Sequence, residues 1–352
     1  MPKQTLLTLP PEALRERITE TVHRHWVAPQ ITEAPFRVPE SDVDCDKLSR
    51  AVLDCMLTRQ FRVGPLPSPD IYERLLKRVR RQVASGQPIL VTVGYAPLKN
   101  LNAVAYSRAD WAEYFALCHL AAWHNKVCGV YAPGLRIRIA FDDTPLLMAN
   151  CADRGAMKSY IDSIRSLVRA LRFDKLIVGT MRHSRFSWVF HLGFYQIARR
   201  RVRRWEAEPA NRAQLDEMDE FARRNVVLPA GLDPNEQDRR IRNASHLYRV
   251  YWEALQISRF WKSRRSLVAM YLDGTQHHIQ QPVALHLTSL DKGQVTQPWQ
   301  GEGALLDNGH GKLEPFVLTG GRRQRYQTQS VEGLEVVPAP GFDRILIAAR
   351  DE

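Results

Sequence analysis

The chain has 352 residues, of which 44% are hydrophobic and 25% charged, a composition typical of a globular protein and not of a disordered or repetitive one. Five cysteines without a C-x-x-C pair exclude a disulfide framework and a zinc knuckle, and the absence of a long apolar run predicts a soluble, cytoplasmic protein that does not enter a membrane. The net charge of +12 fits a nucleic acid, an anionic membrane or an anionic small substrate, and does not choose among them.

The N-terminal part predicts helices joined by an irregular connection. Residues 11–26 have the apolar pattern of an amphipathic helix, and the prolines of 27–44 predict irregular structure. From residue 70 the pattern is stronger, because Asp70 and Glu73 resemble a capping box and apolar residues recur every four positions until Gly86.

Strands and helices then alternate. "PILVTVG" is a short β-branched run typical of a buried strand, residues 109–130 are a long apolar helix, and "LRIRIAF" alternates with period two. A helix over about 156–172 and the strand "KLIVGT" follow. This order predicts a parallel sheet with helical crossovers, so we expect a Rossmann-like core over residues 70–195.

The rest of the chain has a different character. Highly charged helical segments follow residue 196, and short strands separated by glycine-rich turns begin near Leu267. We therefore expect an α/β protein of three parts: an N-terminal helical and irregular segment (1–69), the Rossmann-like core (70–195) and a helical, then mixed α+β region (196–352), with the last boundary between 196 and 235.

Two loops follow the predicted parallel strands at the edge where ligands usually bind. "GYAPLKNLN" contains Lys99 and Asn102, and "FDDTP" contains Asp142 and Asp143. A lysine and a carboxylate in one crevice can bind an anion and move a proton, since each shifts the pKa of the other. The alternative is that Lys99 is a solvated loop residue and Asp142 caps the following segment.

Three stretches, "RVRRQVASGQPILVTVGYAPLKNLN", "YAPGLRIRIAFDD" and "TQPWQG", together resemble the isocyanide (isonitrile) synthase family, also known from pyoverdine and dityrosine biosynthesis proteins. The resemblance covers about residues 75–170 and 296–301. It implies a Rossmann-like fold and an enzyme of specialised metabolism that converts the amine of an amino acid into an isonitrile, with ribulose 5-phosphate as the carbon donor. It implies no metal and no nucleotide cofactor, and a companion iron- and 2-oxoglutarate-dependent oxygenase in the pathway.

The resemblance also implies site residues. The family pattern Pro-x-Lys-x-x-Asn is matched by Pro97, Lys99 and Asn102, and Asp142 is retained from Ser-Asp-Gly-Arg. The pattern Thr-Pro-Trp-His-Gly keeps Trp299. The chain departs from these patterns at three further positions of the expected site, namely Asp143 and Thr144 in place of glycine and arginine, and Gln300 in place of histidine.

These departures describe a divergent member whose reaction can differ. Condensation of a sugar phosphate with an amine needs a cation, a base and a dry site. Lys99 is suited to bind the phosphate or to protonate a carbonyl oxygen. Asp142 is suited to act as the base, and Trp299 could form a wall of the site. The other residues expected to contact the substrate are Pro97, Asn102, Asp143, Thr144 and Gln300. As a loop residue, Lys99 is expected to contribute little to folding.

Other features predict less. His183 and His191 lie eight residues apart, and His277 is adjacent to His278, beside Asp273; neither spacing favours a metal site. The arginines between Arg199 and Arg204 indicate either an anion-binding surface or a helical face paired with the acidic residues that follow, which we favour. A basic RNA- or tRNA-binding protein on a Rossmann-like scaffold is thus the alternative function, although nucleic acid binding is not expected.

Overall fold

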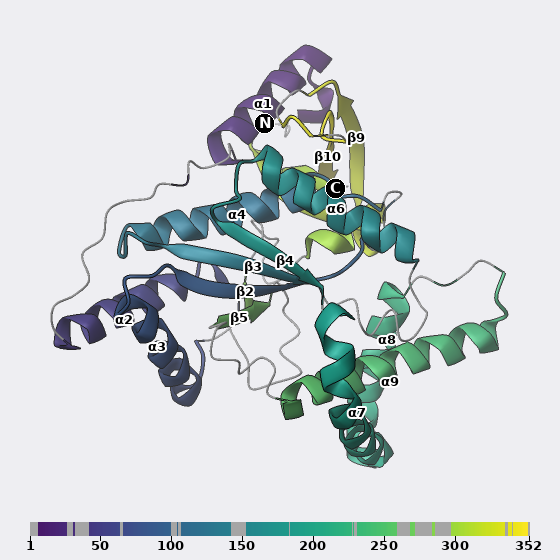
Figure 1. The fold of residues 1–352 in the computed structure, drawn as a ribbon. Coiled ribbons are helices and arrows are strands. Elements are labelled where there is room, and N and C mark those ends of the chain that lie inside the picture. The colour runs from purple at the N-terminus through teal and green to yellow at the C-terminus, as the bar shows by residue number, and fades with distance from the viewer. Residues whose placement is uncertain are drawn as a thin grey trace.

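The computed structural model describes most of the chain. The residues it leaves undescribed are 1–5, 27–30, 32–41, 64–65, 100–103, 105–106, 142–152, 183, 227, 229–230, 259–267, 272–283, 286–296, 335–336, 340 and 351–352. The fold is α/β, as the alternation of strands and helices predicts. Figure 1 shows a central sheet with helices beside it, a second sheet above it near the N-terminal helix, and a group of long helices at the lower right.

The N-terminal region contains one helix more than the sequence patterns indicate. Helix α1 spans Pro11–Trp26, as expected, and follows the short 3-10 helix η1 (Leu6–Thr8). Helix α2 spans Asp42–Met56, partly within the segment expected to be irregular. Its buried residues Cys45, Ser49, Val52 and Met56 recur with helical spacing, a signal that the preceding prolines obscured.

Helix α3 (Pro69–Val83) confirms the predicted helix but not its predicted cap. The residue at the N-terminal cap is Ser68, whose side chain makes no capping hydrogen bond, and Asp70 lies within the first turn. The capping box of Asp70 and Glu73 was therefore wrong. The turn at Gly86 is confirmed: its φ of 65° lies in the left-handed region that glycine adopts without strain.

The central sheet, sheet A, has six strands in the order β1-β6-β5-β2-β3-β4. All neighbours are parallel except β1 and β6, which are antiparallel. The predicted strands are confirmed as β2 (Ile89–Tyr95), β3 (Leu135–Phe141) and β4 (Ile177–Arg182), and the predicted crossover helices as α4 (Trp111–Cys128) and α6 (Arg154–Ala170). The remaining strands are β1 (Arg62–Val63), β5 (Val268–Tyr271) and β6 (Ala284–Leu285).

Strands from distant parts of the chain share sheet A. Strand β5 pairs with β2, so that Gly94 lies opposite Tyr271 on one side and Ala140 on the other. The sheet therefore includes strands from both sides of the boundary expected between residues 196 and 235. Strand β2 lies between β3 and β5. Its carboxyl end is therefore flanked by other strand ends on both sides, at the edge of the sheet where a ligand is expected.

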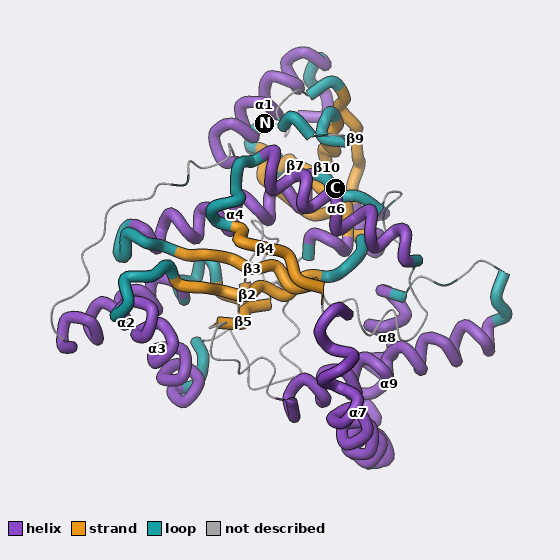
Figure 2. The backbone as a smooth tube through the Cα atoms, in the orientation of Figure 1, coloured by secondary structure: helices purple, strands orange, loops and turns teal. Residues whose placement is uncertain are grey.

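Sheet B is smaller and mixed, with the order β8-β7-β10-β9. Strands β7 and β10 are parallel, and β8 and β9 flank them antiparallel. Figure 2 shows the strands of the two sheets as separate groups. The elements are η5 (Pro298–Gln300), β7 (Gly301–Asp307), β8 (Leu313–Thr319), η6 (Gly320–Arg325), β9 (Tyr326–Glu332) and β10 (Arg344–Arg350).

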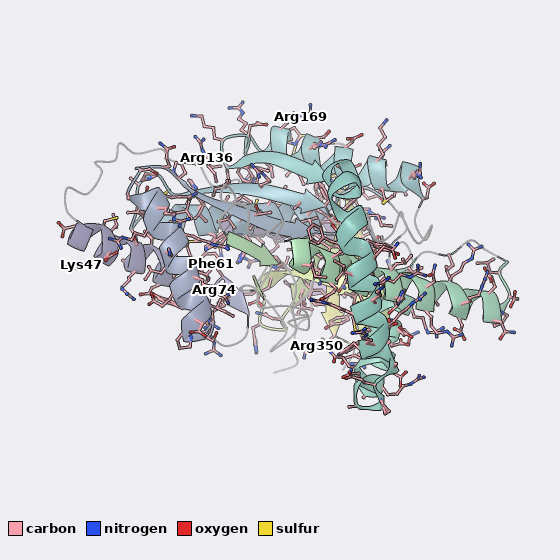
Figure 3. All side chains as sticks on the ribbon, turned by 60° about the horizontal axis from the view of Figure 1, so that its bottom comes forward. Lys47, Phe61, Arg74, Arg136, Arg169 and Arg350 are labelled. Atoms are coloured by element: carbon pink, nitrogen blue, oxygen red, sulfur yellow. The ribbon has the colours of Figure 1, made fainter. Side chains whose placement is uncertain are left out.

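Helix α4 joins the two sheets. It packs against β3 of sheet A, β7 of sheet B, α2 and α6. Residues on all of its sides are buried, among them Trp111, Phe115 and Trp123, which is the pattern of a helix enclosed by protein. Charged side chains at the surface, in contrast, are exposed, as Figure 3 shows for Arg74 of α3, Arg169 of α6 and Arg136 at the start of β3.

The charged segments after residue 196 are helical, as expected, although the first of these helices already begins at Ser184. Helices α7 (Ser184–Ala207) and α9 (Pro234–Ser258) pack along each other, with α8 (Arg212–Asn225) against α9 and the short η2 (Pro209–Asn211) between α7 and α8. The α7–α9 contact buries Ala198, Val202, Val250 and Ala254. Across the part of the chain that the structure describes, none of the helices combines the length and apolar character needed to cross a membrane.

Candidate active site

Lys99 lies in the loop after β2, with its side chain in the protein interior. Only 1% of the side chain is exposed, and Pro97 and Leu98 beside it are also buried. Its Nζ lies 2.7 Å from Asp110 Oδ2 and 2.8 Å from Glu113 Oε2. The alternative of a solvated loop lysine was therefore wrong, since a buried ammonium group needs partners of opposite charge.

Asp110 and Glu113 are positioned by the start of helix α4. Asp110 is the N-cap residue, and Glu113 is the third residue of the helix; together they form a capping box. Asp110 Oδ1 accepts from the N–H of Ala112 at 2.8 Å, and Glu113 Oε2 accepts from the N–H of Asp110 at 2.8 Å. Both carboxylates thus lie where the partial positive charge of the helix N-terminus favours them.

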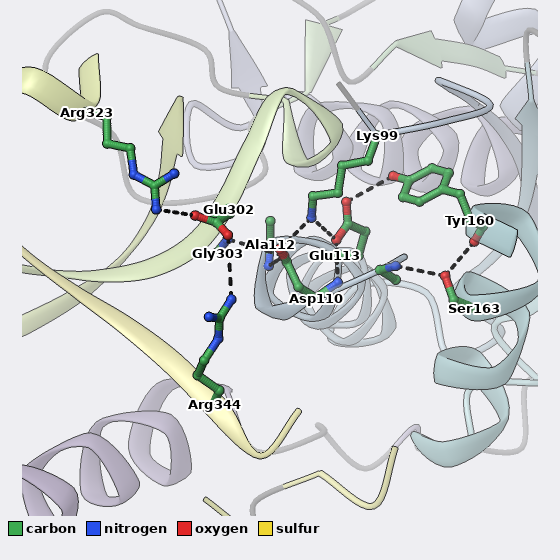
Figure 4. Close-up of polar contacts among 11 residues, drawn as sticks. Lys99, Asp110, Ala112, Glu113, Tyr160, Ser163, Glu302, Gly303, Arg323 and Arg344 are labelled. Atoms are coloured by element: carbon green, nitrogen blue, oxygen red, sulfur yellow. Dashed lines mark hydrogen bonds and ion pairs between the residues drawn. The ribbon is translucent and has the colours of Figure 1, made fainter. Parts of the chain in front are cut away.

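Glu113 is fully buried and accepts three hydrogen bonds (Figure 4). Lys99 Nζ and the N–H of Asp110 donate to Oε2, while the hydroxyl of Tyr160 donates to Oε1 at 2.9 Å. Tyr160 lies on α6, whose Ser163 Oγ accepts from the N–H of Ala109 at 2.8 Å. The loop before α4 is thereby tied to α6, which fixes the distance between the glutamate and the tyrosine.

The burial of Glu113 brings the titration of its carboxyl group close to neutral pH. Burial raises the pKa of the Glu113 carboxyl to about 8, while Lys99 acts in the opposite direction. Burial lowers the pKa of Lys99, but the attraction of Asp110 and Glu113 outweighs it and raises that pKa above its ordinary value. One ammonium facing two carboxylates leaves one negative charge, which protonation of Glu113 removes.

Tyr95, the last residue of β2, extends the cluster toward the edge of sheet A. Its side chain is 2% exposed, and its hydroxyl makes no well-formed hydrogen bond within the described residues, although the Tyr160 hydroxyl is near enough to affect its pKa. Burial and the charge of Glu113 raise the pKa of Tyr95 and of Tyr160 well above the ordinary value. Both tyrosines are therefore neutral hydroxyl groups.

The segment "QPWQG" lies against this cluster from the other side. The Trp299 ring is 4.7 Å from the Tyr95 ring, and the Phe141 ring, at the end of β3, is 5.9 Å from it. The N–H of Gly303 donates to Asp110 Oδ1 at 3.2 Å. Gly303 allows this approach because a Cβ there would lie 2.5 Å from the Trp111 carbonyl carbon. Asp110 thus contacts Lys99 through Oδ2 and strand β7 of sheet B through Oδ1.

The structure describes half of the residues that the sequence predicts for the site. Pro97 and Lys99 lie in the loop after β2, and Trp299 and Gln300 lie in η5, which packs against α4. Asn102, Asp142, Asp143 and Thr144 lie outside the described residues. The strands that lead into the two predicted loops are parallel neighbours with Tyr95 opposite Phe141.

Four residues of the cluster were missed in the sequence: Tyr95, Asp110, Glu113 and Tyr160. The pattern "DWAE" before an apolar run carries the capping-box spacing, and Glu113 is an acidic residue within an otherwise apolar helix. Tyr160 lies in a segment for which the sequence predicts only a helix, over about residues 156–172. An ionisable side chain in a buried pattern is a signal for a partner in the interior.

The histidine clusters cannot be compared with the structure, because His183, Asp273, His277 and His278 lie outside the described residues. Among the residues that are described, no group of three side chains could hold a metal ion.

The arginine run on α7 is paired in only one place within the described residues. Arg201 lies 3.1 Å from Glu253 of α9, while Arg200, Arg203 and Arg204 are exposed and have no ion pair there. Acidic residues that follow the run pair elsewhere: Glu206 Oε1 lies 2.7 Å from Arg249 Nη2. Contrary to our expectation, these ion pairs therefore do not join the arginine run to the acidic residues that follow it.

The comparisons with known proteins give a fold. Neither a protein-family model nor a curated protein sequence matches this chain. Among solved structures, the chain is similar to the crystal structure of the PvcA protein from Pseudomonas aeruginosa, with a TM-score of 0.61 and 15% sequence identity over 86% of this chain and 99% of that chain. At this identity the likeness concerns the architecture alone.

Proposed function

We propose that the chain is a biosynthetic enzyme of the isocyanide synthase kind, which modifies the amine of an amino acid with a sugar phosphate such as ribulose 5-phosphate as carbon donor. The motif resemblance and the shared architecture with PvcA support this proposal from independent directions. The reaction class is a carbon transfer to nitrogen, with proton transfers before and after it.

The observation that carries the proposal is the meeting of the three resembling stretches at one place. Tyr95 precedes the loop of Lys99, Phe141 ends the strand before "DDTP", and Trp299 belongs to "QPWQG". The rings of Phe141 and Trp299 both contact the ring of Tyr95, and Asp110 contacts both Lys99 and Gly303. Separate motifs that share one buried polar cluster are typical of an active site.

The charge balance of the cluster favours one of the two roles considered for Lys99. Its ammonium is already matched by Asp110 and Glu113, so it offers no excess positive charge to a phosphate. The cluster is neutral or carries one negative charge, which suits the ammonium end of an amino acid better than a phosphate. We therefore assign Lys99 to proton transfer, with Asp142 kept as a candidate base.

The experiment that tests the proposal is a product search. The protein is incubated with each amino acid and with ribulose 5-phosphate labelled with carbon-13 at every position, and mass spectrometry follows the amino acids. We expect one amino acid to gain a single labelled carbon on its nitrogen, and the Glu113→Gln variant to give little of this product. No labelled product from any amino acid, with folded protein, would overturn the proposal.

One observation supports the alternative function of RNA binding. The exposed Arg200, Arg203 and Arg204 have no ion pair among the described residues, as expected for a surface that binds the phosphates of RNA. Their replacement by glutamine removes this surface. RNA binding that weakens steeply with salt, and is lost in the triple variant, would favour the second function. Absence of binding by the wild-type protein would exclude it.

A further inference from the structure

The buried cluster contains more hydrogen-bonded groups than are needed to neutralise Lys99. They form a continuous chain of contacts. Asp110 contacts Lys99, Lys99 contacts Glu113 Oε2, and the hydroxyl of Tyr160 donates to Glu113 Oε1. The Tyr160 hydroxyl is near the Tyr95 hydroxyl, which is buried without a well-formed partner in the described part of the chain. An unsatisfied buried hydroxyl beside Trp299 indicates a group that a ligand would contact.

We infer that Tyr95 is a catalytic residue that exchanges a proton with the bound substrate, and that Tyr160, Glu113, Lys99 and Asp110 connect it to solvent as a proton relay. This inference rests on the proposed function and adds to it the path of the proton. The two ends differ in exposure as a relay requires: Tyr95 is 2% exposed, whereas the Asp110 side chain is 28% exposed.

The hydrogen bonds at Glu113 determine where its proton can be. Oε2 already accepts from Lys99 and from the N–H of Asp110, so a proton on the carboxyl group lies on Oε1 and faces Tyr160. A hydroxyl both accepts and donates. Tyr160 can therefore give its own proton to Glu113 while it receives one from Tyr95.

The step is balanced in protons and involves no change of oxidation state. A proton leaves the substrate ammonium for Tyr95 Oη as the proton of Tyr95 moves to Tyr160 and that of Tyr160 moves to Glu113 Oε1. The step starts from the carboxylate form of Glu113, which becomes populated as the pH approaches about 8, and it ends with the carboxylic acid. Release to solvent follows when the protonated carboxyl group of Glu113 turns its proton from Tyr160 toward Lys99. Lys99 then gives a proton to Asp110 and takes that of Glu113, and the partly exposed Asp110 passes its proton to solvent. The titratable groups that face Glu113 in the described residues are thus Lys99, Asp110, Tyr160 and Tyr95.

A kinetic test compares Tyr95→Phe and Tyr160→Phe with a matched control. Tyr131 is a fully buried tyrosine outside the relay, whose hydroxyl donates to the carbonyl of Gln87 at 2.8 Å. We expect each relay variant to lower kcat by roughly 100-fold to 10,000-fold with little change in KM, and Tyr131→Phe to stay within about threefold. Relay variants that behave like Tyr131→Phe would overturn the inference.

An infrared test does not depend on turnover. The carboxylic acid band of protonated Glu113 should disappear on titration to alkaline pH with a midpoint at a pH of about 8, and should be missing in Glu113→Gln. Tyr160→Phe should shift this band because its hydrogen bond is lost, and Tyr95→Phe should shift it less. A band that neither variant moves would overturn the relay, while a wild-type protein with the band but without product would contradict the proposed function alone.

Discussion

Lys99 and Glu113 form an ion pair in which Nζ and Oε2 are 2.8 Å apart, and neither side chain exposes more than 1% of its surface. Buried ion pairs of this kind cost desolvation energy, which the mutual attraction and further hydrogen bonds must offset. Asp110, Tyr160 and the helix N-terminus provide those hydrogen bonds here. The loop after β2, the start of α4 and helix α6 therefore hold the pair together, which explains how a loop lysine is accommodated in the interior.

Replacement of Lys99 by alanine should destabilise the protein, contrary to the expectation for a loop residue. Glu113 and Asp110 would lose their common cation, and removal of one partner of a buried pair costs about 3–5 kcal/mol. Urea denaturation should show this loss for Lys99→Ala and almost none for Lys77→Ala on the exposed face of α3. In the double variant Lys99→Ala with Glu113→Gln, part of the stability should return. Equal stability of both single variants would show that the pair is unimportant for folding.

Glu113 should make stability depend on pH. Its pKa in the folded protein is about 8, above the ordinary 4.5, so its contribution is present below pH 4.5 and is lost as the pH rises through 8. In Glu113→Gln the amide mimics the protonated carboxyl, with its oxygen toward Lys99 and its NH₂ toward Tyr160. The stability of the wild type relative to this variant should therefore fall between pH 5 and pH 8. A constant difference over this range would contradict the raised pKa.

Gly303 should not tolerate a side chain. A Cβ there would collide with the backbone of Trp111 and Ala112 at the start of α4, and such overpacking costs about 1–3 kcal/mol or more. Gly303→Ala should lower the melting temperature and, because it displaces Asp110, also turnover. Gly193→Ala, in helix α7 with no atom near the new Cβ, should be neutral or stabilise by up to about 1 kcal/mol. Equal melting temperatures for the two variants would refute the close contact.

Arg249 should stabilise the helical group of α7, α8 and α9. Its side chain is 8% exposed and contacts Glu206 of α7 at 2.7 Å and Asp219 of α8 at 3.5 Å. Arg249→Ala removes charged hydrogen bonds worth about 1.5–3 kcal/mol each. Arg201→Ala breaks the more exposed pair with Glu253 and should cost less than about 1 kcal/mol. In denaturation monitored by the circular dichroism of the helices, Arg249→Ala should lose more stability than Arg201→Ala. A larger loss for Arg201→Ala would contradict this account.

The local elements of this protein could be predicted from its sequence. Apolar spacing identified α1, α3, α4 and α6, and the runs "PILVTVG" and "LRIRIAF" identified β2 and β3. The reason is that period and burial are coupled within one element, since each helix or strand hides one set of side chains from water. The alternation of these elements also indicated the parallel arrangement of β2, β3 and β4.

The partners of the charged residues, in contrast, were decided only by tertiary structure. Lys99 was expected to face Asp142 because the two loops follow neighbouring strands, and that expectation remains a prediction. The structure places Lys99 between Asp110 and Glu113, and brings Trp299 of a distant segment to Tyr95. Nothing in the local spacing of a lysine encodes which carboxylate it meets, because that depends on how helix α4 is enclosed between two sheets whose strands come from both halves of the chain.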